Sequence, residues 1–121
     1  MRGEQSPRSV IFSPMPAPAI TVEDLKAKQD RDEPVTIVDV REPHEWAING
    51  LPGSLKIPLG ALPQRFAEIP KDGEVVVHCR SGGRSAQAVE FLRARGYDKA
   101  FNLAGGINRW AEVIDPAMPR Y

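Results

Sequence analysis

The alternation of short apolar runs with helical segments constrains the fold of this chain more than any other feature. The runs PVTIVDV (residues 34–40) and EVVVH (74–78) carry β-branched residues at consecutive positions, which is typical of strands buried on both faces. Two weaker runs, 53–59 and 98–106, predict further strands. Short connections predict an α/β fold, with a mainly parallel sheet flanked by helices on both faces. The helices are expected at residues 22–29, 42–48, 60–70, 84–96 and 107–114.

The length of 121 residues fits one domain of ordinary size. Prolines are dense in residues 1–18 and oppose both helix and sheet. We therefore predict an N-terminal arm or linker over residues 1–18 and a single domain over residues 19–121.

Charge and hydropathy exclude several classes of function. The 16 basic and 16 acidic side chains cancel, so bulk charge gives no support for binding to nucleic acid or to an anionic membrane. No apolar run approaches the roughly 20 residues of a membrane helix, and the N-terminus lacks the apolar core of a signal peptide. One cysteine allows neither an internal disulfide nor a cysteine-rich zinc site. A protein of the cytoplasm is therefore expected.

The single cysteine, Cys79, follows a predicted buried strand and precedes a loop rich in glycine and arginine. Gly82 and Gly83 allow positive φ, so successive backbone N–H groups can turn toward a common centre. The helix that follows adds the positive end of its dipole, and Arg80 and Arg84 add two formal charges. All of these favour a thiolate, so the thiol pKa should be lowered and the residue should be a nucleophile.

Other residues near the predicted strand ends have two interpretations. Asp39 and Arg41 end the first apolar run, where they either form the rim of an active site or pair with charges that tie loops together. We favour the structural role for both, and also for Glu45. His78 precedes Cys79, but neighbouring strand residues point to opposite faces, so it is not expected to act as a base.

Together with the loop after Cys79, three other segments make the chain resemble the rhodanese family. Four segments carry the resemblance, in the family's order: VDVREPHEW (38–46), LPGSLKIPL (51–59), VVVHCRSGGRSAQA (75–88) and NLAGGINRW (102–110). The resemblance covers about residues 19–112 and implies a three-layer sandwich of helices around a parallel sheet. It also implies sulfur transfer through a persulfide on Cys79, without a metal or an organic cofactor.

The resemblance assigns substrate binding to the loop after the nucleophile. Arg84 is expected to help hold the anion, and Arg80 to steer the substrate. The hydroxyls of Ser81 and Ser85 either donate to the sulfur or cap the helix. The expected substrate-binding residues are thus Arg80, Ser81, Gly82, Gly83, Arg84 and Ser85.

The C-terminal segment WAEVIDPAMPRY (110–121) narrows the resemblance. It is similar to the ends of rhodanese domains fused to E1-like adenylyltransferases of the molybdenum-cofactor and thiamine pathways, which give sulfur to a carrier protein. This implies a sulfur-carrier protein and an E1-like adenylyltransferase as partners, beside a small donor such as thiosulfate or a persulfide. A monomer is expected.

Two alternatives stay open. A rhodanese-like domain can serve as a non-enzymatic docking module, although inactive members usually lack the cysteine. The other alternative is a cysteine-dependent phosphatase or arsenate reductase. Such enzymes of related fold place five residues between the cysteine and the arginine, whereas four residues separate Cys79 from Arg84 here.

The chain also departs from the family at Gly50, where many members have a histidine.

Overall fold

The computed structural model describes residues 17–121. Most of the predicted proline-rich arm, residues 1–16, lies outside the described residues. The core of the structure is one sheet in the order β1-β5-β4-β2-β3, and every neighbouring pair is parallel. The strands are β1 (Ala19–Ile20), β2 (Val35–Asp39), β3 (Leu55–Lys56), β4 (Glu74–His78) and β5 (Ala100–Leu103).

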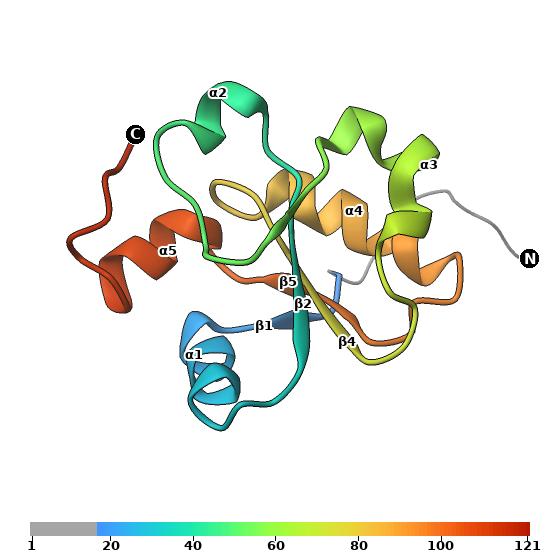
Figure 1. The fold of residues 1–121 in the computed structure, drawn as a ribbon, viewed down its shortest axis with the longest axis horizontal. Coiled ribbons are helices and arrows are strands. Elements are labelled where there is room, and N and C mark those ends of the chain that lie inside the picture. Colours follow the sequence, from blue (N-terminus) through green and yellow to red (C-terminus); the bar gives the residue numbers. More distant parts are fainter. Residues whose placement is uncertain (1–16) are drawn as a thin grey trace, which may run out of the picture.

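Helices cover both faces of this sheet, as predicted (Figure 1). On one face, α3 and α4 pack against the sheet through residues such as Leu62, Ala88 and Leu92. On the other face, α1 and α5 do so through Leu25 and Ile107. The helices are α1 (Val22–Asp30), α2 (Pro43–Trp46), α3 (Leu62–Arg65), α4 (Gly83–Arg93) and α5 (Gly106–Val113).

The three valines of β4 show why this strand is apolar at every position. Val75 and Val77 belong to the core under α3 and α4, whereas Val76 belongs to the core under α1 and α5. Because strand side chains alternate between faces, a central strand with helices on both sides needs apolar residues throughout. Cys79 lies on the same face as Val77 and packs into the core under α3 and α4.

Helix starts mostly follow the sequence signals. The Thr21 hydroxyl accepts a hydrogen bond from the Asp24 amide at 3.0 Å, so Thr21 caps α1. Pro43 lies at the first position of α2. The longest helix, α4, begins at Gly83 and ends at Arg93, which is within three residues of the predicted range.

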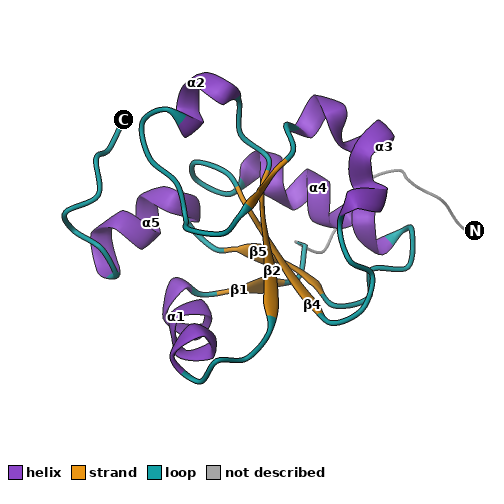
Figure 2. Cartoon of the chain, in the orientation of Figure 1, coloured by secondary structure: helices purple, strands orange, loops and turns teal. Residues whose placement is uncertain are grey.

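The segment 60–70 is not the single helix that was predicted. It divides into a 3₁₀ turn (Leu59–Ala61), α3 and a second 3₁₀ turn (Phe66–Glu68), drawn as short coils in Figure 2. Pro63 has no N–H to donate and is tolerated only in the first turn of a helix. A helical stretch centred on this proline therefore breaks into short turns.

Strand β1 was not predicted. It has two residues at the edge of the sheet, pairing with Asn102 and Leu103 of β5, and it directly follows a proline. Such a short segment has no periodicity of its own to detect. No helix within residues 17–121 is long and apolar enough to cross a membrane.

Candidate active site

Cys79 lies at the carboxyl end of β4, where the chain turns through Arg80–Gly82 into α4. The residue is 2% exposed, and its sulfur is surrounded by hydrogen-bond donors. The Gly82 amide donates to Sγ at 3.1 Å and the Ser85 hydroxyl lies 3.3 Å from it. We call the donors around Sγ, namely the amides of Ser81, Gly82 and Ser85 and the Ser85 hydroxyl, the cradle.

The cradle lowers the pKa of the Cys79 thiol. Burial alone raises the pKa of this group, because it penalises the charged thiolate, but the hydroxyl of Ser85 and the three amides outweigh burial. The loop therefore favours the thiolate, which is the nucleophilic form of cysteine. This agrees in direction with the sequence prediction, although the donors are neutral amides and a hydroxyl.

The N-terminus of α5 holds the loop from behind. The amides of Ile107 and Asn108 donate to the carbonyls of Cys79 and Arg80 at 3.0 and 3.1 Å. These amides belong to the first helical turn, so they have no partner within their own helix. In a trans peptide the C=O and the next N–H point in opposite directions, so a carbonyl held by α5 turns the Ser81 amide toward the sulfur.

Gly106 makes this approach possible. Its φ of +61° is in the left-handed region, and a Cβ atom there would lie 2.5 Å from the Arg80 carbonyl oxygen and 2.7 Å from the Ser81 nitrogen. Both obstructing atoms are backbone, so a side chain cannot be accommodated without moving the loop. The contact of this glycine with the loop of Cys79 was not predicted from the sequence.

The predicted anion-binding arginine is engaged elsewhere. Arg84 makes a bidentate ion pair with Glu45 of α2, with N–O distances of 2.7 and 2.9 Å. The pair raises the pKa of Arg84 and holds that of Glu45 well below its usual range. Glu45 is 5% exposed, so the geometry agrees with its predicted structural role. The negative charge of Cys79 still acts on Arg84.

Tyr121 connects this ion pair to the neighbouring charges. Its hydroxyl donates to Glu45 at 2.7 Å and accepts from Arg41 at 2.9 Å. Its ring lies under the Arg80 guanidinium, 4.7 Å from the centroid, and Arg80 also donates to the Tyr121 main-chain oxygen. Figure 2 shows the tail after α5 running back toward α2. We call Arg41, Glu45, Arg80, Arg84 and Tyr121 the charged cluster.

Asp39, Arg41 and His78 form a buried group beside the cradle, and all three are 0% exposed. Arg41 donates to both Asp39 oxygens, at 3.0 and 2.8 Å. Burial raises the Asp39 pKa, but the hydrogen bonds from Arg41 outweigh it and lower the pKa overall. Burial lowers the pKa of His78, which lies on the opposite face of β4 from Cys79. Arg41 also donates to the side chain and the main-chain carbonyl of Asn49, so it links the end of β2 to the segment after α2.

The serines of the loop have different surroundings. Within residues 17–121, the side chain of exposed Ser81 has no hydrogen-bond partner, and Gly82 is the N-cap residue of α4. Ser85 is fully buried and its hydroxyl faces the sulfur. Neither serine caps α4, because the N-cap residue is Gly82, and the Ser85 hydroxyl lies 3.3 Å from Sγ and 2.6 Å from the Asn102 Oδ1 atom.

Two residues at the site were missed in the sequence. Asn102 of β5 contacts both the Ser85 hydroxyl and the Gly82 carbonyl, and Tyr121 joins the charged cluster. Asn102 lies within one of the four segments that resemble the family, and a polar residue at the end of a buried strand is a usable signal. Tyr121 lies in the C-terminal segment that narrowed the resemblance, but nothing in that segment indicated its partners, which are 41 or more positions away.

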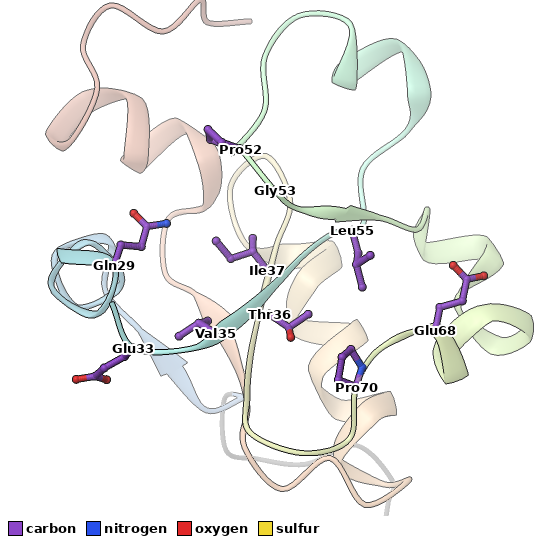
Figure 3. Close-up of a pocket in the computed structure, with 10 residues that line it drawn as sticks. All are labelled: Gln29, Glu33, Val35, Thr36, Ile37, Pro52, Gly53, Leu55, Glu68 and Pro70. Carbon is purple, nitrogen blue, oxygen red and sulfur yellow. The ribbon is translucent and has the colours of Figure 1, made fainter. Parts of the chain in front are cut away.

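A cavity of about 490 Å³ lies away from this site (Figure 3). It opens near the amino end of β2 and is lined by Val35, Ile37, Leu55 and Pro70 among others. None of its lining residues belongs to the cradle or the charged cluster. Within residues 17–121, no three His, Cys, Asp or Glu side chains gather where they could hold a metal ion.

Comparisons with known proteins agree with this geometry. The sequence model of the Rhodanese-like domain family matches residues 21–113. A sulfurtransferase of Allochromatium vinosum is 45% identical over 92 residues, which are 76% of this chain and 86% of that protein. The solved structure of a human single-domain sulfurtransferase, TSTD1, has a TM-score of 0.70 and 31% identity, covering 80% of this chain and 97% of that one.

Longer proteins share the domain as well. The probable adenylyltransferase/sulfurtransferase MoeZ of Mycobacterium tuberculosis is 34% identical over 104 residues, which are 84% of this chain but 26% of MoeZ. The present chain thus spans about a quarter of that relative. The family model matches most of the chain, and the structure has a parallel sheet with the cysteine loop at its carboxyl edge. The chain therefore belongs to the rhodanese-like domain family.

Proposed function

We propose that this chain is a sulfurtransferase that carries sulfane sulfur as a persulfide on Cys79. The observation that carries the proposal is the cradle, in which neutral donors converge on Sγ with the Gly82 amide at 3.1 Å and the Ser85 hydroxyl at 3.3 Å. Donors that are already in place stabilise a negative charge on the sulfur, and this needs no proton transfer from an acid or to a base. The sulfurtransferases among its relatives support the same chemistry.

The first half-reaction loads the enzyme. The Cys79 thiolate attacks the outer sulfur of thiosulfate or of a donor persulfide, and an S–S bond forms to Sγ. The donor's own S–S bond breaks, and sulfite or the donor thiolate leaves with the electron pair. The negative charge then resides on the outer sulfur, above the loop. With Cys79 2% exposed, a donor with a slender sulfane end fits the approach.

The second half-reaction returns the thiolate. A nucleophilic acceptor attacks the outer sulfur, and Sγ leaves with the electron pair of the broken S–S bond. The cradle stabilises this leaving thiolate, so the same donors assist both steps. All electrons are supplied by the donor and the acceptor, and the chain itself is unchanged after a full cycle.

The physiological acceptor in this proposal is a sulfur-carrier protein. The likeness to MoeZ, an adenylyltransferase/sulfurtransferase, and the C-terminal segment that ends at Tyr121 support it. In this reading the chain would supply sulfur for a carrier's thiocarboxylate, in company with an E1-like adenylyltransferase. A stand-alone transfer to a small thiophile is the simpler form of the same activity.

An intact-mass experiment tests the proposal. The purified chain is incubated with thiosulfate or with a small persulfide, the excess donor is removed, and the intact mass of the protein is measured. We expect one added sulfur atom, its loss on adding cyanide, and no addition in Cys79→Ser, because a serine hydroxyl is a far weaker nucleophile at neutral pH. A Cys79 that reacts readily with iodoacetamide but gains sulfur from neither donor would contradict the proposal and favour a docking module.

A further inference from the structure

Asn102 links the loop of Cys79 to the neighbouring strand. It lies on β5, directly opposite Val77 of β4, and its side chain reaches the start of α4. Its Nδ2 donates to the Gly82 carbonyl at 3.2 Å, and its Oδ1 lies 2.6 Å from the Ser85 hydroxyl. Asn102 thus contacts two residues of the cradle without contributing a donor to the sulfur.

The Gly82 carbonyl fixes which way the Asn102 amide faces. A carbonyl oxygen only accepts hydrogen bonds, so the NH₂ group must face it and the Oδ1 atom must face Ser85. The reverse orientation would place two acceptors 3.2 Å apart. The amide therefore presents an acceptor to the Ser85 hydroxyl.

The Ser85 hydroxyl has one proton and three possible acceptors. Sγ of Cys79 and the Gly82 carbonyl are both 3.3 Å away, whereas Asn102 Oδ1 is 2.6 Å away. Ser85 is fully buried, so water does not provide a further partner. The proton must go to one of these atoms, and the choice depends on which atom carries negative charge.

We propose that Asn102 is a positioning residue, which provides the second acceptor for the Ser85 proton. Ser85 then donates to Sγ while Sγ carries the negative charge and to Asn102 when Sγ is neutral. In the neutral thiol, the Ser85 oxygen is free to accept from the S–H group. Asn102 therefore stabilises the thiol relative to the thiolate, and tempers the effect of the amides.

The consequence for catalysis rests on the proposed function. When an S–S bond forms at Sγ, the charge moves to the outer sulfur and Sγ becomes neutral. The Ser85 proton then turns to Asn102, so the hydroxyl no longer points at an uncharged atom, while the backbone amides of the cradle stay in place. When the outer sulfur departs, the proton turns back to the thiolate. The hydroxyl thus follows the charge through the cycle with a rotation about one bond.

Several charged or titratable groups surround this switch. Arg84 acts on the charge of Cys79 and is paired with Glu45, which Tyr121 also contacts. Arg80 lies over the Tyr121 ring, and the His78 ring contacts the Cys79 carbonyl. None of them hydrogen-bonds Asn102 within residues 17–121, so a substitution there tests the Ser85 proton and not these pairs.

The test is the pH dependence of alkylation of the free thiol by iodoacetamide, measured for substitutions at residue 102. Asn102→Leu removes the acceptor, so the midpoint should shift down by about half a pH unit or more. Asn102→Asp offers a stronger acceptor and a negative charge, so the midpoint should shift up by about one pH unit. Non-specific damage to the loop would instead move both variants in the same direction, and that result would overturn the proposal.

The Ser85→Ala background isolates the route of the effect. Without the hydroxyl, Asn102→Leu should leave the midpoint unchanged, and Asn102→Asp should keep only its charge effect. Equal shifts in the two backgrounds would overturn the proposal, and the Leu variant alone decides this if the Asp variant does not fold. Gln87→Glu and Gln87→Leu, on the exposed face of α4, are the matched controls and should change little.

This measurement is independent of the sulfur donor. Alkylation reports the thiolate of Cys79 whether or not the chain accepts sulfur. One outcome is a chain that never forms a persulfide and still shows a downward shift in Asn102→Leu and an upward shift in Asn102→Asp. That result would contradict the proposed function and support the role of Asn102. A chain that forms the persulfide but shows neither shift would support the proposed function and contradict the role of Asn102.

Discussion

The cradle and the charged cluster lie side by side at the carboxyl edge of the sheet, but they are built in opposite ways. The cradle takes its donors from residues within six positions of Cys79 and uses neutral amides and a hydroxyl. The charged cluster joins residues up to 80 positions apart and uses formal charges, including the ion pair between Arg84 and Glu45. One surrounds a reactive atom, and the other fixes the orientation of the arginines near it.

This difference indicates how the site divides its tasks. Neutral donors can accommodate a sulfur that is first charged and then uncharged, because they carry no counter-charge that would be left unpaired. Buried ion pairs hold a fixed geometry, and breaking one leaves an uncompensated charge. We therefore expect the cradle to control reactivity and the charged cluster to control stability, and three substitutions test this.

Gly106→Ala should have the largest effect, because it displaces the loop that carries the cradle. The new Cβ would lie 2.5 Å from a backbone oxygen and would occupy a left-handed φ. We expect a loss of about 2 kcal/mol or more in the free energy of unfolding, together with slower alkylation of Cys79 at pH 7. Urea unfolding and iodoacetamide kinetics measure the two effects.

Gly50→Ala is the control for this substitution. A Cβ at Gly50 meets nothing within 4 Å, and its φ is not positive. We expect both measurements to be close to those of the unsubstituted chain. Equal behaviour of the two alanine variants would show that α5 does not set the geometry of the cradle.

Glu45→Gln should break the charged cluster and spare the cradle. The pKa of Glu45 in the folded chain lies well below its usual range, because of Arg84, the Glu42 amide and Tyr121. Its carboxylate therefore stabilises the fold above the unfolded pKa of about 4.3, and this stabilisation is lost as the pH falls toward the folded value. The variant should lose about 1–3 kcal/mol at pH 7 and depend less on pH between 5 and 3.

Urea unfolding at several pH values measures this effect. Glu68→Gln provides the contrast, because Glu68 pairs with Arg65 on the surface, where the side chains are 50% and 41% exposed. Exposed pairs contribute about 0–1 kcal/mol, so this control should change little. A Glu45→Gln variant as stable as the control would remove the ion pair with Arg84 from the account of stability.

Tyr121→Phe should have the smallest effect and sharpens the comparison within the charged cluster. It removes the hydroxyl between Arg41 and Glu45 but keeps the ring under Arg80. We expect a loss of about 0.5–1.5 kcal/mol in the free energy of unfolding and an unchanged pH midpoint for alkylation of Cys79. A shifted midpoint would mean that the tail acts on the cradle as well.

Parts of the fold were predictable because their signals are local. The β-branched runs predicted β2 and β4, and the helix predicted to start at residue 22 begins at Val22. The segment 60–70 failed because Pro63 divides it, and β1 failed because two residues have no period. Weak local preference leaves such segments to be decided by their neighbours.

The sequence by itself predicted Cys79 as the nucleophile and a loop of amide donors around it, since these residues lie within six positions of Cys79 and the strand–loop–helix order places them together. The tertiary structure alone decided that α5 would hold the loop, that Asn102 would face Ser85 and that Glu45 would take Arg84. Those contacts depend on how β5, α5 and α2 pack around β4. Local spacing carries no record of that packing, because side chains distant in the chain meet only when the two cores have formed.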